Sequence, residues 1–282
     1  MAASISANST LTQDAVQRIL INPLTQKSSY LSLGFPTFSS NGEPIKVPTL
    51  TSLGTPGYVA EGSAIPDVTA TTSEVEFLPS SVLAIKVLAR MSNELVRAAV
   101  VNVEQAFSTK LVSDVTRVLD AAMWDGAGTG GAPLGMARFA GNVNSGTVAG
   151  TALASGNLID MQEDALDNYL DFNALAWAVS PSNWTRIRKM TDNYGARILQ
   201  PSLAEGAPGT LLGNPYVVSS HVPAGSILLF DRTQVGVGFD QRASITILDQ
   251  TFADYDQVAV RVTARYDTAA LNPGAVIQLH VS

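Results

Sequence analysis

The most regular hydrophobic pattern in the chain is helical and covers residues 92–122. Its apolar positions recur mostly at i, i+4 spacing, and they are Leu95, Ala99, Val103, Phe107, Leu111, Val115, Val118, Leu119 and Ala122. The opposite face is polar and includes Arg97, Lys110 and Arg117. With Ser92 as the expected N-cap, the pattern predicts one unbroken amphipathic helix, roughly 45 Å long, with one side exposed to solvent.

Residues 44–88 alternate with a period of two, and they predict a long β-hairpin. The apolar side of this alternation includes Val75, Phe77, Leu83, Ile85 and Val87. A loop rich in glycine and proline, GTPGYVAEGSAIPD, separates the two arms. A two-stranded hairpin has no second layer over its apolar face, so we expect this one to lie against a larger surface. That surface is either the hairpin's own domain or a second copy of the chain.

Between Lys46 and Lys86, the charges of the hairpin are all of one sign. Between residues 47 and 81 the ionisable side chains are Glu61, Asp67, Glu74 and Glu76. Because complementary charges favour a contact and like charges oppose it, an all-acidic hairpin would dock best on a basic surface.

The remaining pattern completes an α+β chain. Helices are expected after Asn157, as the cap of the first, and after Ser180, from Pro181 to near Tyr194. Strands are expected at residues 174–179, 216–219, 226–230, 235–239, 244–248, 257–266 and 275–281. The first 40 residues are polar, so they form either a frayed terminus or an arm that orders against a partner. The glycine-rich stretch that begins at Gly126 follows a helix and contains no lysine, which indicates a connector and not a phosphate-binding loop.

Composition excludes metal and redox sites that are built on cysteine or on three histidines. The 282-residue chain has no cysteine and two histidines, His221 and His280, which rules out thiolate zinc sites, iron–sulfur clusters and three-histidine metal sites. We find no catalytic motif and expect neither an enzyme nor a cofactor. The alternative from this class is a hydrolase that uses His221 with a nearby serine.

Charge and hydropathy point toward assembly. A net charge of −7 argues against sequence-independent binding to nucleic acid, which needs clustered positive charge. Only 15% of the residues are charged and 46% are hydrophobic, which favours a chain that buries surface against copies of itself. No apolar run is long enough to span a membrane, and the N-terminus lacks the pattern of a secretory signal, so we expect synthesis inside the cell.

Five parts of the chain carry a resemblance to one protein family. They are YVAEGSAIP; LARMSNELVRAA; DAAMWDGAGTGGAPLGM; WAVSPSNWTRIRKMTDNYGARIL with TLLGNPYVVSSHVPAG; and VRVTARYDTAALNPGAVIQL. In this order they resemble the extended loop, the approach to the spine helix, the end of that helix, the axial domain and the closing strands of the major capsid protein of tailed bacteriophages. The same fold also builds encapsulin compartments. The resemblance covers nearly all of the chain from residue 44 onward.

The resemblance implies an α+β phage major capsid fold with five parts. They are an N-terminal arm (1–43), an extended β-hairpin loop (44–88), a peripheral domain with a long spine helix (89–125), a mixed axial domain (126–250) and closing strands of the peripheral domain (251–282), the last of which could return to the axial domain. It implies a structural protein that self-assembles into the icosahedral head shell around double-stranded DNA, without sequence-specific binding to it and without a membrane. An encapsulin-type compartment shell is the alternative.

In such a shell the hairpin would reach over an adjacent subunit. The inter-subunit contact candidates are Glu61, Glu74 and Glu76 on the hairpin, and Arg97, Lys110, Arg117, Arg261 and Arg265 as their basic partners. The implied partners are other copies of the chain in hexamers and pentamers, with a separate scaffolding protein, a portal, and a decoration or cementing protein as further candidates. The resemblance places the protein in the virion, after assembly in the host cytoplasm.

Overall fold

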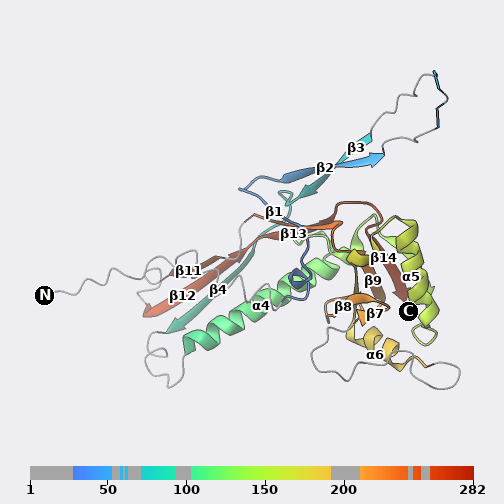
Figure 1. Ribbon diagram of the computed structural model, residues 1–282. Coiled ribbons are helices and arrows are strands. Elements are labelled where there is room, and N and C mark those ends of the chain that lie inside the picture. The colour runs from blue at the N-terminus through green and yellow to red at the C-terminus, as the bar shows by residue number, and fades with distance from the viewer. Residues whose placement is uncertain are drawn as a thin grey trace.

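The computed structural model describes residues 28–52, 58–59, 61–62, 71–92, 103–191, 210–240, 244–248 and 255–282. The fold is α+β, as predicted. A long helix, α4 (Val103–Asp125), runs between a three-stranded and a six-stranded sheet, and the hairpin of β2 (Ile45–Ser52) and β3 (Thr71–Phe77) projects from the middle of the molecule (Figure 1). The first 27 residues, which make up most of the predicted arm, lie outside the described residues.

Helix α4 carries the predicted apolar stripe. Leu111, Val115 and Leu119 are buried at four-residue spacing, and they belong to a core that continues into both sheets. The prediction was wrong for Val118, which is 48% exposed because it lies at the solvent edge of the stripe. The prediction of Ser92 as the N-cap was wrong, because Ser92 is the last residue of strand β4 (Ile85–Ser92), opposite Gln257. The predicted first turns, residues 93–102, lie outside the described residues.

The three-stranded sheet lies along α4 (Figure 1). Its antiparallel order is β11 (Ser244–Leu248), β12 (Gln257–Ala264) and β4 (Ile85–Ser92). The sequence predicts residues 83–88 as the end of the hairpin, but Val87 lies opposite Val262 of β12, and both pack in the core beside α4. That prediction was wrong because alternation identifies a strand with one buried face and does not identify its partner.

The six-stranded sheet lies at the C-terminal end of α4. Its order is β5 (Val143–Val148), β14 (Val276–Val281), β9 (Ser226–Asp231), β6 (Leu175–Val179), β8 (Asn214–Val218) and β7 (Thr210–Leu211). Helices α5 (Ser155–Asp167) and α6 (Pro181–Lys189) contribute to the core on one face, and the end of α4 contributes to the core on the other. Because both faces are covered, β6 and β9 are buried along their whole length.

Two helix boundaries differ from the prediction. Asn157 is not the N-cap of α5, because Ala154 holds that position. The backbone N–H of Ala154 donates a hydrogen bond to Asn157 Oδ1 at 3.0 Å. Helix α6 has the predicted cap, Ser180, but it ends at Lys189, five residues before the predicted end near Tyr194.

From Ser28 onward the predicted arm is part of the core. Tyr30 and Phe35 are buried, and the Tyr30 ring meets Trp124 edge-on with centroids 4.9 Å apart. A third sheet follows, made of β1 (Thr37–Ser39), β10 (Val235–Phe239) and β13 (Tyr266–Ala270). Beyond residue 28, therefore, neither a frayed terminus nor a partner-ordered arm describes this segment, because its own aromatic side chains bury it.

Candidate assembly interface

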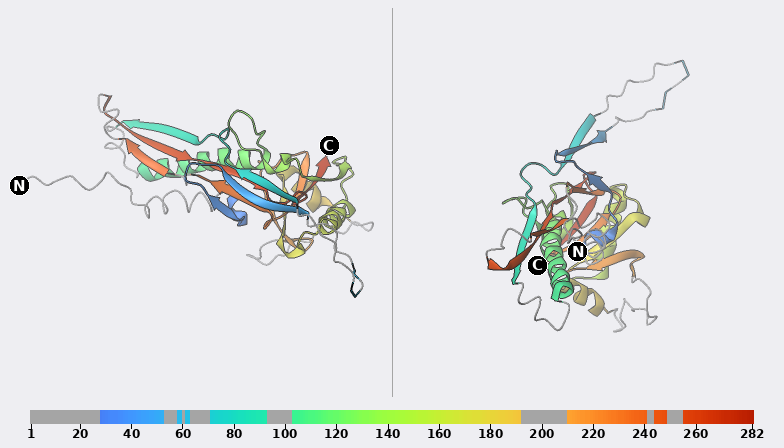
Figure 2. Two further views of the ribbon diagram at one scale, coloured as in Figure 1. Left: turned by 90° about the horizontal axis from the view of Figure 1, so that it is seen from above. Right: turned by 90° about the vertical axis from the view of Figure 1, so that its left-hand side faces the viewer.

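The hairpin stands out from the body of the molecule (Figures 1 and 2). Strands β2 and β3 form a two-stranded antiparallel sheet of their own, with Val47 opposite Val75. Near the tip, Tyr58 is fully exposed. Contact with the body is concentrated at the end of β3, where Phe77 and Leu78 are completely buried. The described part of the hairpin is thus anchored at its base and open to a second surface along its length.

The base of the hairpin rests on two glycines of β10. A Cβ atom on Gly236 would lie 2.7 Å from Phe77 Cζ, and one on Gly238 would lie 2.9 Å from Phe77 Cβ. Phe38 stacks on the Phe77 ring with centroids 5.2 Å apart. The alternating valines of the β10 sequence VGVGF are buried in the core on the other side. This strand therefore presents a flat shelf, because only glycine leaves room for the Phe77 ring.

Arg265 fastens the segment that follows the hairpin. Its guanidinium donates to the carbonyl oxygens of Leu78 at 3.3 Å, Pro79 at 3.1 Å and Val82 at 3.1 Å, and it forms an ion pair with Asp240 at 3.1 Å. The sequence makes Arg265 a candidate receptor for a neighbouring hairpin. Because its side chain is only 18% exposed and is used by its own chain, we remove it from that set.

Asp267 binds the same segment from two residues further along. Its Oδ2 accepts a hydrogen bond from the backbone N–H of Leu78 at 2.7 Å, and its Oδ1 accepts one from the N–H of Thr268 at 2.8 Å. Burial raises the pKa of Asp267, and the two hydrogen bonds and the charge of Arg265 act in the opposite direction. Sequence reasoning missed this residue, for which the available signal is a lone carboxylate in the strand YDTAA.

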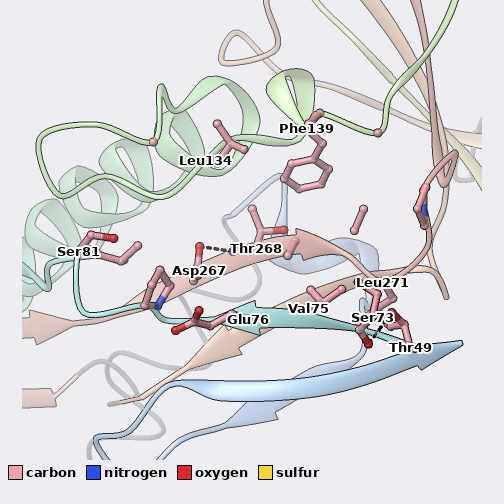
Figure 3. Close-up of a pocket in the computed structure, with 18 of the residues that line it drawn as sticks. Thr49, Ser73, Val75, Glu76, Ser81, Leu134, Phe139, Asp267, Thr268 and Leu271 are labelled. Carbon is pink, nitrogen blue, oxygen red and sulfur yellow. Dashed lines mark hydrogen bonds between the residues drawn. The ribbon is translucent and has the colours of Figure 1, made fainter. Parts of the chain in front are cut away.

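A groove of about 440 Å³ opens between β3, the glycine-rich connector and β13 (Figure 3). Its walls are largely apolar and include Val75, Leu134 and Phe139, while Glu76 and Asp267 add carboxylates. The groove gives the hairpin base a recessed surface that could accept an apolar side chain.

The three acidic candidates are exposed. Glu74 and Glu76 are two residues apart on β3, so they lie on the same face of the strand. Glu74 pairs with Lys46 of β2 at 3.4 Å, with both side chains 63% exposed. Glu61 lies near the hairpin tip and is also exposed. An acidic edge therefore follows the hairpin on its solvent side.

Two of the basic candidates lie on the exposed side of α4, and one lies outside the described residues. Lys110 forms an ion pair with Asp114, one helical turn away, at 3.0 Å. Arg117 is exposed on the same helix. Arg97 falls in residues 93–102, which the structure does not describe.

Arg261 lies on the outer face of the sheet of β11, β12 and β4, and this face is turned away from α4. Thr263 shares that face and lies opposite Lys86 of β4, so the sheet brings Lys86 and Arg261 together. Both line a cavity of about 380 Å³. Leu88, which lies opposite Arg261, is 47% exposed on the same face. Sequence reasoning missed Lys86 and Leu88, because only the strand register places them beside Arg261.

The described residues offer little for catalysis. They contain no cluster of His, Asp and Glu side chains that could hold a metal ion. The Ser219 hydroxyl accepts hydrogen bonds from the backbone N–H of His221 at 3.3 Å and from the Ser29 hydroxyl at 3.0 Å, so it serves to anchor these segments. This arrangement gives no support to a hydrolase built on His221. Within the described ranges, no helix combines the length and apolar character needed to cross a bilayer.

Comparison with known proteins gives a consistent assignment. The model of the phage capsid family matches residues 8–281. The capsid of a native GTA particle is 16% identical with a TM-score of 0.72, over 100% of this chain and 95% of that chain. A chain from Mycobacterium phage Bobi is 17% identical with a TM-score of 0.74, over 90% of both chains. The virus-like particle from Pyrococcus furiosus is 12% identical with a TM-score of 0.61, over 96% of this chain and 100% of that chain. Among curated protein sequences there is no match. The chain belongs to the phage capsid family.

Proposed function

We propose that this chain is the structural major capsid protein of a phage and that copies of it assemble, as hexamers and pentamers, into the icosahedral head shell around double-stranded DNA. The observation that carries the proposal is the projecting acidic hairpin, on a fold matched over nearly the whole chain by the family model. Assembly in the host cytoplasm, and a separate scaffolding protein, a portal and a decoration protein as partners, belong to the same proposal.

The hairpin of one subunit docks on its neighbour, on the outer face of the sheet of β11, β12 and β4. Glu74 and Glu76 supply negative charge, and Lys86 and Arg261 supply the positive charge that they meet. We favour this face over the α4 candidates because it combines two cations with the exposed apolar side chain of Leu88.

The energy of this contact comes from many weak terms. An exposed ion pair contributes about 0.2–1 kcal/mol, and full burial of a leucine side chain contributes about 1.5–3 kcal/mol. One docked hairpin would therefore be weak alone. Because every subunit of a closed shell gives and receives one hairpin, the sum stabilises the particle, and the ion pairs make assembly sensitive to salt.

Charge reversal tests the docking proposal. Arg261→Glu should abolish shells in electron micrographs of the purified protein, while circular dichroism of the subunit stays unchanged. Glu74→Lys in the same chain should restore assembly, because it exchanges the two charges. Arg188→Glu is the matched control, since Arg188 is an exposed arginine on α6, away from the sheet face. Wild-type assembly by the Arg261→Glu chain would refute the docking proposal.

The contents of the particle separate a phage head from an encapsulin-type compartment. The Pyrococcus furiosus particle has a lower TM-score, 0.61, than the Mycobacterium phage Bobi chain, 0.74, which supports the phage head as the first choice. Particles purified from the native source should contain double-stranded DNA. Particles that lack DNA and hold a copurifying protein would favour the compartment instead.

A further inference from the structure

The two arms of the hairpin are attached to the body in different ways. The incoming arm is held by its backbone: β1 pairs with β10, and the N–H of Ser40 donates to the carbonyl of Phe239 at 2.9 Å. The outgoing arm continues from Phe77 into residues 78–84, which lie outside any strand before β4 begins. Side chains of the body hold the first part of this outgoing segment, and a backbone bond from the N–H of Leu83 to the carbonyl of Gly131, at 2.8 Å, holds its end.

Leu78 is the point at which the outgoing arm turns. Its φ is 55°, in the left-handed region that costs a non-glycine residue roughly 1 kcal/mol or more. Its side chain is completely buried. A strained backbone persists only where its surroundings determine it, and both polar backbone groups of Leu78 are bound by side chains, the carbonyl by Arg265 and the N–H by Asp267.

Arg265 and Asp267 lie two residues apart in the chain, and both bind backbone groups of this turn. The guanidinium gathers three carbonyl oxygens, those of Leu78, Pro79 and Val82, which lie within five consecutive residues. Its remaining bond, to Asp240, neutralises the charge and fixes the plane of the fork. Lysine, a point charge without a planar fork, could not reproduce this set of bonds.

A small change at this turn becomes a large one along the hairpin. Strand β3 has seven residues, which span about 23 Å at about 3.3 Å per residue. A rotation of about 10° at its base would move the far end of β3 by about 4 Å, which is the limit for an ion pair, and it would move Glu74, three residues from Phe77, by about 2 Å. The direction of the hairpin therefore decides whether its carboxylates reach a neighbouring subunit.

We propose that Arg265 and Asp267 form a clamp that sets the direction in which the hairpin leaves the body, so that assembly depends on them more than folding does. The first half of this proposal concerns the single subunit. The second half rests on the proposed function of the chain as a shell subunit.

Distance measurements between spin labels test the clamp in the full-length, unassembled chain. The sequence has no cysteine, so Thr72→Cys on β3 and Ser113→Cys on α4 provide two unique labels at exposed positions. The parent should give one narrow distance distribution. Arg265→Gln and Asp267→Asn should each broaden it. Arg138→Gln should leave it unchanged, because Arg138 also binds a carboxylate and a carbonyl, but both belong to Asp125 and neither to residues 78–84.

Each outcome decides the proposal. A distribution that is equally narrow in Arg265→Gln and the parent overturns the clamp, as does equal broadening in Arg138→Gln. If Arg265→Gln fails to fold, Arg265→Lys replaces it, because lysine keeps the charge beside Asp240 and loses the fork; it too should broaden the distribution. Shell yield should then fall by at least about fivefold, the effect of about 1 kcal/mol per subunit. A parent that forms no shells refutes the proposed function, and the distance measurement still judges the clamp.

Discussion

The glycine shelf under the hairpin makes a sharp prediction for Gly236→Ala. The new methyl group would lie 2.7 Å from Phe77 Cζ and 2.9 Å from Phe38 Cε2, whereas carbon atoms pack best at about 3.5–4.0 Å. Phe77 has no free space to retreat into, because its side chain is completely buried. Its ring must therefore move by roughly 1 Å, and the hairpin base must move with it.

The expected cost is about 1–3 kcal/mol, the usual range for overpacking a core. The loss of glycine's backbone entropy in the unfolded chain offsets about 0.4–1 kcal/mol of it. The difference between the two ranges is about 0–2.6 kcal/mol, and we expect a net destabilisation near its middle, about 1–2 kcal/mol. Urea unfolding of the unassembled chain, followed by tryptophan fluorescence, measures it, because Trp124 and Trp177 are completely buried in the body.

A rescue variant and a control separate steric conflict from a general effect of alanine. Phe77→Leu removes the ring that the methyl group would contact, so it should cost less in the Gly236→Ala background than alone. Gly156→Ala adds a methyl group in α5 where no atom lies within 4 Å, and it should be neutral or stabilising. If Gly236→Ala unfolds at the same urea concentration as the parent, the shelf does not position Phe77 as we argue.

Three further predictions concern buried and exposed charge. Asp120→Ala should cost about 2–4 kcal/mol and expose residues 28–35 to proteases, because the buried carboxylate accepts bonds from the backbone and hydroxyl of Ser29 at 2.8 Å each. Lys46→Ala should change stability by less than about 1 kcal/mol, because its pair with Glu74 is exposed. Because burial raises the pKa of Asp267, this group stabilises the fold at acid pH and loses that contribution as pH rises through its folded pKa. The unfolding free energy of the wild type minus that of Asp267→Asn should therefore increase as the pH falls from about 7 to about 4. Paired urea titrations would measure this difference.

Local patterns in the sequence predicted elements well and their partners poorly. The stripe of α4, the cap of α6 and the buried strands β6 and β9 are all readable, because period and capping chemistry are local properties. The assignment of β4 to the hairpin was wrong, because its pairing with β12 joins residues far apart in the sequence. The arm beyond residue 28 was misread for a similar reason: its aromatic residues, Tyr30, Phe35 and Phe38, show no regular period, and the partners of Tyr30 lie on α4 and β13.

At the candidate site, the sequence predicts the charge of each segment but not the surroundings of each charged side chain. The acidic character of the hairpin follows from composition alone. The use of Arg265 within the subunit could not be predicted, because the carbonyls that it binds belong to residues nearly two hundred positions earlier in the chain. Arg261, four residues before it, lies on the exposed outer face. Two arginines on the same stretch of chain thus differ in role through burial.

A rigid hairpin base and weak contacts along the hairpin depend on each other. A flexible hairpin would lose much conformational freedom on docking, and exposed ion pairs of about 0.2–1 kcal/mol would not offset that loss. A base fixed in advance removes most of this cost, so weak contacts suffice. Weak contacts in turn allow a misplaced hairpin to detach before a growing shell closes around it. Strengthening the interface without stiffening the base should therefore produce more malformed particles and no more closed shells.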